Sequence, residues 1–471
     1  MDPQNDGSNN LQPHLTQLRQ AWQQQRPDYT QRRDDLQRLR AVFKARIGQM
    51  SEAISADFGH RSHHESIIAD GMTVTGEIDH LLSHLRRWMK PERIGVGWRF
   101  WPARAQVRAV PVGVVGVISP WNYPVNLALV PLATAIAAGN HVLLKPSEHT
   151  PATSAFLQSL LADVFPADRV RVVQGDASVA SAFSALPFDH LVFTGSTAVG
   201  RKVMAAAAQH LTPLTLELGG KSPAVIAADY PIAGAAARLA TGKWFNAGQT
   251  CIAPDYVLID DGRLDALVQA LREQVGLRYG NFDDAGDYSR IINAAQFERL
   301  KGYVSDARAR GLQVIELAQI DAERQRRERL FPPTLILQPG DDATVMQEEI
   351  FGPILPIRSY RHLEEAIATI NGRDRPLALY PFSHDKTTVE KIVGQTVSGG
   401  VTVNDTLLHF AINGLPFGGI GASGMGAYHG RAGFDAMSKR LPVLWQTKRA
   451  GSDLLRPPYA RVARFIDMIS R

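Results

Sequence analysis

The chain has 471 residues, of which 45% are hydrophobic and 21% are charged. This composition excludes a disordered or fibrous protein, and the length suggests two or three domains of roughly 150 residues each. Its 51 Lys and Arg residues against 46 Asp and Glu residues leave a net charge of only +5, so a nucleic-acid-binding protein is not expected. No signal segment is recognisable at the start and no apolar run reaches the ~20 residues of a membrane span, so we expect a cytoplasmic protein.

Two amphipathic helices are predicted near the start of the chain. Apolar residues recur at three- and four-residue steps over 36–54, which predicts one helix there. A second helical stretch is predicted over 67–88. His60, His63 and His64 lie between the two, but no further ligand pair accompanies them, so no metal site is predicted.

From about residue 112 onward, short apolar runs alternate with helix-compatible segments. Continuous runs of Val, Ile and Leu that alternate with helices are typical of βαβ units, in which helices cover both faces of a parallel sheet. The pattern therefore predicts a doubly wound, nucleotide-binding sheet. Its strands are expected at 112–118, 141–144, 170–173 and 190–193.

A second α/β unit is predicted to begin close to Gly219-Gly220, because two adjacent glycines favour a boundary. The alternation of strand and helix starts again after them. Its first elements are expected to be a strand at 224–226, a helix at 232–244 and a strand at 256–259.

Two short segments place reactive groups near this boundary. Glu217 ends an apolar run, where partial burial would raise the pKa of its carboxyl toward that of a working base; a glutamate turned to solvent is the alternative. Cys251, the only cysteine in the chain, follows a glycine-containing turn of small residues that would keep its sulfur accessible. A lone cysteine excludes an intramolecular disulfide and is most often inert, so its neighbours must decide its role.

Two other segments lie where a predicted strand ends. The segment 193–200 opens a helix after a strand, where backbone N–H groups and the helix dipole favour an anion. Its spacing is not G-x-G-x-x-G, so an ordinary glycine-containing turn is the alternative. The same alternative applies to 145–148. Both segments are expected at the carboxyl edge, where open α/β sheets bind ligands.

Seven short motifs along the chain, taken in order, resemble the motif series of the aldehyde dehydrogenase superfamily. The later segments Asn404-Asp405, 421–426 and 428–430 are similar to its class 3 branch, and the whole is most similar to the coniferyl aldehyde dehydrogenases within that branch. The motifs are Pro120-Trp-Asn-Tyr-Pro124, Lys145-Pro-Ser-Glu148, Phe193-Thr-Gly-Ser196, Glu217-Leu-Gly-Gly-Lys221, Gly248-Gln-Thr-Cys251, Glu349-Ile-Phe-Gly-Pro353 and Leu415-Pro-Phe-Gly-Gly419.

The resemblance implies oxidation of an aldehyde to a carboxylic acid with NAD(P). Cys251 would attack as a thiolate to give a thiohemiacetal. The side-chain amide of Asn122 and the backbone N–H of Cys251 would hold its oxyanion, although Asn122 taken alone fits a simple turn former equally well. After hydride transfer to the nicotinamide, Glu217 would activate the water that hydrolyses the thioester.

The resemblance also implies a set of cofactor contacts. Lys145 and Glu349 would hold ribose hydroxyls, and Phe351 would pack beside the nicotinamide. Without the resemblance, Glu349 would be read as half of an exposed acidic pair with Glu348. The remaining expected contacts are Ser147 and Glu148 on one segment and Gly195 and Ser196, which would approach the pyrophosphate, on another.

The expected preference between NAD and NADP depends on Glu148. Relatives place an acidic residue near the adenine ribose, where a carboxylate accepts hydrogen bonds from the 2′-hydroxyl and repels a 2′-phosphate. We therefore expect NAD to be preferred, with NADP also accepted.

The alternation of strands and helices and the family resemblance together predict an α/β fold. It would have a Rossmann-like parallel-sheet cofactor domain, a second α/β catalytic domain and a small β oligomerisation element. In that element Arg99–Val110 would pair with Leu441–Thr447, and class 3 relatives imply a homodimer. The expected segments are 1–98 for N-terminal helices of the cofactor domain, 112–217 with 411–440 for the NAD(P)-binding domain, 218–410 for the catalytic domain, and 99–111 with 441–459 for the oligomerisation element.

Several aromatic side chains are expected around the thiol, where they would stack on a planar substrate. Core packing is the alternative for each one. Together with the resemblance they favour a coniferaldehyde-like aromatic aldehyde, and a long-chain aliphatic aldehyde is the second candidate. The expected residues are Tyr123, Trp244, Phe245, His409 and Phe410.

Two other classes of function are less favoured. In a CoA-acylating dehydrogenase CoA takes the acyl group, and such relatives usually lack the glutamate base, so Glu217 argues for hydrolysis. A non-catalytic binding protein on this scaffold would have no need of Cys251, Glu217 and Asn122 together.

Overall fold

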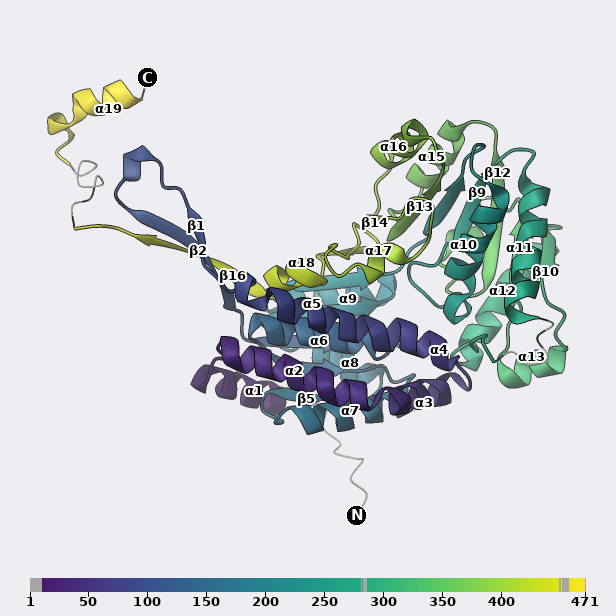
Figure 1. The fold of residues 1–471 in the computed structure, drawn as a ribbon, viewed down its shortest axis with the longest axis horizontal. Coiled ribbons are helices and arrows are strands. Elements are labelled where there is room, and N and C mark those ends of the chain that lie inside the picture. The colour runs from purple at the N-terminus through teal and green to yellow at the C-terminus, as the bar shows by residue number, and fades with distance from the viewer. Residues whose placement is uncertain (1–10, 281, 283–285, 449, 451–456, 471) are drawn as a thin grey trace, which may run out of the picture.

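The computed structural model describes residues 11–280, 282, 286–448, 450 and 457–470. They form a six-stranded, a seven-stranded and a three-stranded sheet. The two larger sheets with their helices form two lobes, and the smallest sheet projects from the first lobe as a narrow arm (Figure 1). Across the described ranges, no helix is long and apolar enough to cross a bilayer.

The sheet of the first lobe is parallel except at one edge, where β15 pairs antiparallel with β7. From the central strand β3 the chain adds β4 and β5 on one side and then β6 and β7 on the other. This reversal creates a switch point between β3 and β6, where open α/β sheets bind ligands. The predicted Rossmann-like sheet is confirmed. Its strands are β3 (Val114–Ile118), β4 (His141–Lys145), β5 (Val170–Val172), β6 (His190–Gly195), β7 (Leu214–Leu218) and β15 (Gly424–Met425).

Helices cover both faces of this sheet. Val115 and Val117 pack into one core with α6, while Val114 and Leu143 pack into another with α1 and α9. Burial on both faces is why the strands read as continuous apolar runs. The helices of the lobe are α1 (Gln12–Gln24), α2 (Tyr29–Ala45), α3 (Ile47–Phe58), α4 (His63–Ser66), α5 (Thr73–Trp88), α6 (Asn126–Ala138), α7 (Pro151–Val164), α8 (Ala177–Ser184), α9 (Thr197–Ala208) and α18 (Gly430–Ala436).

The prediction of one helix over 36–54 is wrong. The chain leaves helical geometry at Arg46, whose φ is −114° and ψ is 15°, and forms α2 before it and α3 after it. The apolar repeat runs through the break because both helices bury the same side. The second predicted helix, 67–88, also divides: Ile67–Met72 is π-helical and α5 follows it.

The sheet of the second lobe is parallel except for its edge strand β10. The strands predicted at 224–226 and 256–259 and the helix at 232–244 are confirmed as β8, β9 and α10. Its strands, in sheet order, are β10 (Gln313–Glu316), β11 (Thr334–Leu337), β12 (Ile354–Tyr360), β9 (Tyr256–Asp260), β8 (Pro223–Ile226), β13 (Ala378–Phe382) and β14 (Gly400–Val401). Its helices are α10 (Ile232–Trp244), α11 (Leu264–Tyr279), α12 (Ala294–Ala309), α13 (Ala322–Glu328), α14 (Thr344–Gln347), α15 (Leu363–Asn371), α16 (Lys386–Gln395) and α17 (Leu408–Ala411).

The arm is an antiparallel sheet in which β2 (Arg104–Pro111) lies between β1 (Glu92–Ile94) and β16 (Ser438–Trp445). The chain at Trp98–Phe100 forms a 3₁₀ turn and not the expected strand, and β1 was not predicted because three exposed residues carry no alternation. Helix α19 (Ala463–Ile469) follows near the C-terminus. The parts of the expected segments that fall at 1–10, 281, 283–285, 449 and 451–456 lie outside the described residues.

Candidate active site

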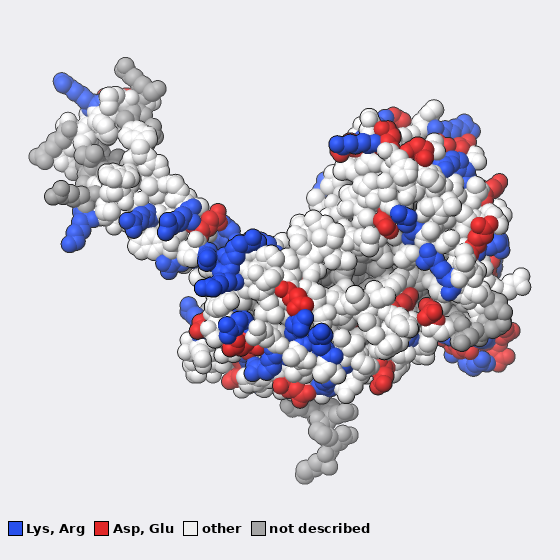
Figure 2. Space-filling view, viewed as in Figure 1, with Lys and Arg blue, Asp and Glu red and all other residues white. Residues whose placement is uncertain are grey.

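A cavity of about 1250 Å³ lies between the two lobes, where the surface is hollowed (Figure 2). The carboxyl ends of β3, β4, β6 and β7 open into it from one side, and the segments that follow α10 and α14 line it from the other. Every catalytic and cofactor-binding residue predicted from the sequence lines this one cavity. They are Asn122, Lys145, Ser147, Glu148, Gly195, Ser196, Glu217, Cys251, Glu349 and Phe351.

A strained turn presents Cys251 to the cavity. After α10 the backbone is left-handed at Asn246, Ala247 and Gly248, with φ values of 51°, 50° and 74°, and strain of this kind concentrates at functional sites. A Cβ on Gly248 would collide with the carbonyl of Gly352, so only glycine fits there. The turn leaves Cys251 half-buried.

The environment of the Cys251 thiol favours its protonated form. Burial raises the pKa of the thiol, and the carboxylates of Glu349 and Glu217 raise it further. The backbone N–H groups of Cys251 and Ile252 donate to the sulfur and partly oppose this shift. A proton acceptor is therefore needed before the sulfur can act as a nucleophile.

Glu217 provides a carboxyl group in the same cavity. It lies on β7 opposite Thr194 of β6 and Gly424 of β15, and its side chain is only 2% exposed. Neither carboxyl oxygen has a hydrogen-bond partner among the described residues. Burial therefore raises the pKa of Glu217 well above its usual value, so this group binds a proton more strongly than an exposed glutamate does.

Asn122 lies in the loop after β3 and reaches the nucleophile turn. Its side-chain Nδ2 donates a hydrogen bond of 3.1 Å to the carbonyl oxygen of Gln249. Its own carbonyl oxygen accepts from Arg61 Nη1 at 3.1 Å and from Asn246 Nδ2 at 3.0 Å. An amide nitrogen carries two hydrogens, so the Asn122 side chain keeps one donor for a ligand in the cavity.

The segment after β4 forms a charged pair at the edge of the cavity. Lys145 is 1% exposed, and its Nζ lies 2.8 Å from Glu148 Oε2. Partial burial of Glu148 is the largest single influence and acts to raise its pKa, but the hydrogen bond and charge of Lys145, a backbone hydrogen bond and the charge of His149 together outweigh it, and the pKa is lowered. Glu148 therefore carries a negative charge at neutral pH. Ser147 is buried beside it, and its Oγ accepts from the N–H of His149.

Gly195 and Ser196 lie at the end of β6, where α9 begins. Ser196 is the N-cap of α9, and its Oγ accepts from the backbone N–H of Val199 at 3.4 Å. A Cβ on Gly195 would approach the Phe193 ring to 2.6 Å. The cavity is thus lined here by backbone at a helix N-terminus, a favourable environment for phosphate groups.

Glu349 and Phe351 face the cavity from the second lobe. Burial raises the pKa of Glu349 to about 8, and Asp255 contributes to the shift. A Cβ on Gly219 would collide with the Glu349 carboxylate, so the glycine after Glu217-Leu218 makes room for it. The Phe351 ring meets Trp121 edge-on, with 5.3 Å between the ring centroids.

Sequence reasoning missed the residues that support Glu349. Lys221 forms a buried ion pair with Asp255 and donates to the carbonyl oxygen of Glu348 at 2.8 Å, while Asp255 Oδ1 accepts from the N–H of Ile350 at 3.0 Å. Lys221 is the last residue of the Glu217–Lys221 motif, but no motif contains Asp255.

Tyr428 is a further cavity residue for which the sequence predicted no role. It lines the cavity with its hydroxyl buried, and that oxygen has no partner within the ranges that the structure describes.

The prediction of aromatic residues at the cavity is partly wrong. Tyr123, Phe245 and Phe410 line it, as do Trp121 and other rings. Trp244 instead lies in the core, where its indole N–H donates to Pro353, and His409 is buried against Phe417. Spacing along the chain cannot show on which side of a turn a ring will point. The described chain also contains no group of three or more His, Cys, Asp or Glu residues placed to hold a metal ion.

This combination of fold and site defines a class of protein. Residues 16–441 match the profile of the aldehyde dehydrogenase family. The chain therefore belongs to this family, which confirms the resemblance seen in the motifs, and it is an NAD(P)-dependent aldehyde dehydrogenase.

Individual proteins give a finer comparison. The chain is 48% identical to a probable coniferyl aldehyde dehydrogenase of Pseudomonas aeruginosa, over 96% of this chain and 94% of that protein. It is 42% identical to aldehyde dehydrogenase family 3 member A2 of Rattus norvegicus, over 88% and 84%. Among solved structures, the substrate-bound state of Staphylococcus aureus AldH matches with a TM-score of 0.93 and 35% identity, over 98% and 100%.

Proposed function

We propose that this protein oxidises a coniferaldehyde-like aromatic aldehyde to its carboxylic acid, with Cys251 as nucleophile and Glu217 as general base. One observation carries the proposal. The only thiol of the chain and a buried carboxyl group without a partner among the described residues line the same cavity. Neither a buried unpaired carboxyl nor a strained turn is expected at an ordinary packing site, since each is costly.

In the first step Glu217, as the carboxylate, takes the proton from the Cys251 thiol. The sulfur then forms a bond to the aldehyde carbon, and the carbonyl π electrons move to the oxygen. The free Nδ2 hydrogen of Asn122 and the backbone N–H of Cys251 donate to that oxyanion. The product is a thiohemiacetal held on the protein.

The residues of the cavity fit a nicotinamide dinucleotide. Glu349 Oε1 is buried and has no partner in the described part of the chain, as expected for a group that would accept from a ribose hydroxyl. Lys145 would contact a ribose, Gly195 and Ser196 at the start of α9 would receive the pyrophosphate, and Phe351 would lie beside the nicotinamide. When bound, this cofactor accepts the hydride that turns the thiohemiacetal into a thioester.

Glu217 acts again when the thioester is hydrolysed, after it has released the proton of the first step to solvent. Its carboxylate takes a proton from water as the water oxygen attacks the thioester carbon. The carbon–sulfur bond then breaks and the sulfur takes this proton back from Glu217, which releases the carboxylic acid and returns the thiol. A base with a raised pKa suits this step, because it accepts a proton from water more readily than an exposed glutamate.

We expect turnover to rise with pH and to depend on Glu217. Only the carboxylate form is a base, and a raised pKa means that this form becomes populated above the normal glutamate range. kcat should therefore increase as the pH rises through the Glu217 pKa and should then level off. Glu217→Gln should lower kcat by about 10²-fold or more and remove this rise. A pH profile of steady-state NADH formation for both proteins measures the effect.

Mass spectrometry of the same variant shows which step fails. Glu217→Gln should acylate Cys251 slowly, because solvent must then take the thiol proton, and should accumulate the acyl group because hydrolysis has lost its base. Cys251→Ala should form no adduct and show no turnover while still binding NAD. Steady turnover near wild type in either variant contradicts the assignment. Adding CoA tests the acylating alternative, since only a CoA-acylating enzyme would need CoA for turnover.

We infer that NAD is preferred over NADP because Glu148 is charged at the edge of the cavity. Two like unit charges about 4 Å apart repel each other by roughly 1 kcal/mol when water screens them. Glu148→Gln should thus raise kcat/KM for NADP by roughly fivefold and leave that for NAD nearly unchanged. Asp265→Asn, an exposed charge change on α11, is the control. A wild-type enzyme with higher kcat/KM for NADP would refute the inference.

Two observations support an aromatic aldehyde as the substrate: the aromatic side chains of the cavity and the name of a similar protein. Trp121, Tyr123, Phe245 and Phe410 line the cavity that holds Cys251, and planar rings stack favourably on such a wall. The similar protein of Pseudomonas aeruginosa is named for coniferyl aldehyde. A long-chain aliphatic aldehyde is the second candidate, because an apolar wall also binds alkyl chains.

We expect coniferaldehyde to have the highest kcat/KM when compared with decanal and acetaldehyde. Stacking adds roughly 0.5–1.5 kcal/mol for each good ring contact, so a lead of about tenfold over decanal is reasonable. Phe410→Leu keeps an apolar side chain and removes the ring, and it should reduce that lead. If decanal leads by tenfold or more, the aromatic assignment is wrong.

The arm supports a homodimer. It exposes several large apolar side chains, including Phe100, Trp101 and Leu444, at 55%, 74% and 59%, and such clusters are typical of protein interfaces. Light scattering after gel filtration should give twice the mass of one chain. Leu444→Lys should shift this mass toward one chain, whereas Leu277→Lys, an equally apolar position 79% exposed on α11, should not. A wild-type monomer refutes the proposal.

A further inference from the structure

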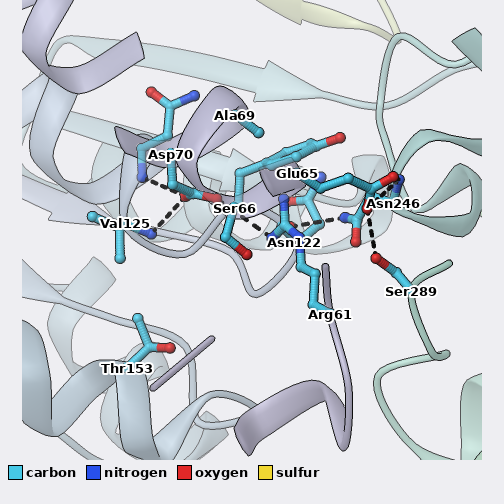
Figure 3. Close-up of polar contacts among 12 residues, drawn as sticks. Arg61, Glu65, Ser66, Ala69, Asp70, Asn122, Val125, Thr153, Asn246 and Ser289 are labelled. Carbon is cyan, nitrogen blue, oxygen red and sulfur yellow. Dashed lines mark hydrogen bonds and ion pairs between the residues drawn. The ribbon is translucent and has the colours of Figure 1, made fainter. Parts of the chain in front are cut away.

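Three charged side chains are buried behind the nucleophile turn and the Asn122 loop (Figure 3). Arg61, Glu65 and Asp70 are only 1%, 9% and 0% exposed. Arg61 precedes α4, Glu65 lies on α4, and Asp70 lies in the π-helical segment Ile67–Met72. None of them lines the cavity, so none is placed to touch substrate or cofactor.

Asp70 fixes the chain that follows Asn122. Its Oδ1 accepts from the backbone N–H groups of Val125 at 3.2 Å and Asn126 at 2.8 Å, where α6 begins. Its Oδ2 lies 3.4 Å from Arg61 Nη1. The π-helical turn that carries Asp70 is a rare geometry that often accompanies functional sites.

Arg61 fixes Asn122 itself. Its Nη1 donates to the Asn122 carbonyl oxygen at 3.1 Å. Its guanidinium lies over the ring of Tyr123 at 4.9 Å, the next residue of the loop. The arginine thus holds the main chain on which the proposed oxyanion donor is mounted.

Glu65 fixes the nucleophile turn. Each of its carboxylate oxygens lies 3.3 Å from the backbone nitrogen of Asn246, which donates to them, and the Ser289 hydroxyl donates to one of them at 2.6 Å. Asn246 has the left-handed φ of 51°, so this bond holds a strained residue in place. Asn246 Nδ2 in turn donates to the carbonyl of Asn122, which joins the two segments.

The burial of three charged side chains at this place is unfavourable in free energy. Taking each ion out of water costs several kcal/mol, and well-packed apolar residues often serve stability equally well. Burial raises the pKa of both Asp70 and Glu65, and Arg61 opposes the shift in each case. What the charges supply, and apolar residues would not, is directed hydrogen bonds to named backbone atoms of two loops.

We propose that Arg61, Glu65 and Asp70 are positioning residues that fix the Asn122 loop relative to the Asn246–Cys251 turn. This relative position matters because the two oxyanion donors, Asn122 Nδ2 and the Cys251 N–H, come from different lobes of the fold and must point at the same oxygen atom. This inference rests on the proposed roles of Asn122 and Cys251.

The test separates hydrogen bonding from charge at Glu65 and Asp70. Glu65→Leu removes the acceptor for Asn246 and should lower kcat by about tenfold or more, whereas Glu65→Gln keeps an acceptor and should restore most of it. Asp70→Asn keeps Oδ1 but loses the charge facing Arg61, and it should lower kcat severalfold. The NAD dissociation constant should stay within about twofold in all three variants, because the cofactor contacts lie elsewhere.

A second readout is the rate at which iodoacetamide alkylates Cys251, which is unambiguous because the chain has one cysteine. Glu65→Leu should change this rate and Glu65→Gln should return it toward wild type. If Glu65→Leu does not fold, Ser289→Ala, which removes only the hydroxyl donor to Glu65, takes its place and should lower kcat severalfold.

The matched control is Asp35→Asn. Asp35 is 0% exposed and pairs with Arg38 and Arg169, but it contacts neither loop, so its loss should lower the melting temperature and leave kcat unchanged. The inference is overturned if the folded fraction of each Glu65 and Asp70 variant keeps the wild-type kcat, or if NAD affinity falls in parallel. Turnover by Cys251→Ala would instead overturn the proposed function.

Discussion

The removal of the Glu217 carboxyl from water is the constraint on which the site depends. Its oxygens have no partner among the described residues, so the charged form is poorly stabilised there. The position is enforced by the sheet, since β7 is paired on both sides, by β6 and β15, and cannot turn the residue outward without breaking a ladder. A parallel sheet buried on both faces thus provides the dry surroundings that a strong base requires.

Glycines let the segment 349–352 approach both catalytic segments closely. Gly248 in the nucleophile turn lies against the backbone of Gly352, and Gly219 after the base makes room for Glu349. The segment 349–352 therefore touches both the turn that carries the thiol and the strand end that carries the base. A displacement of this segment on cofactor binding would be transmitted to the nucleophile turn, because Gly248 and Gly352 meet without a flexible side chain between them to absorb it.

Short sequence patterns predicted several strands of the two large sheets and the residues of the site. Apolar runs located β3 to β6, β8 and β9 because strands buried on both faces need such runs, and the predicted catalytic and cofactor-binding residues all line one cavity. The break at Arg46 was missed because two helices that bury the same side preserve one repeat. Trp244 and His409 were placed wrongly because spacing does not fix the direction of a side chain. Arg61, Glu65 and Asp70 carry no local signal, since each acts on loops far along the chain.

The presence of a single thiol in the chain has a consequence for oxidative damage. A cysteine oxidised to sulfenic acid is commonly rescued when a neighbouring cysteine captures it as a disulfide. The chain has no second cysteine, so a sulfenic acid at Cys251 can form a disulfide only with an external thiol that enters the cavity. A ligand that fills the cavity therefore shields the sulfur from oxidant, but it also shuts out the reductant that would repair it.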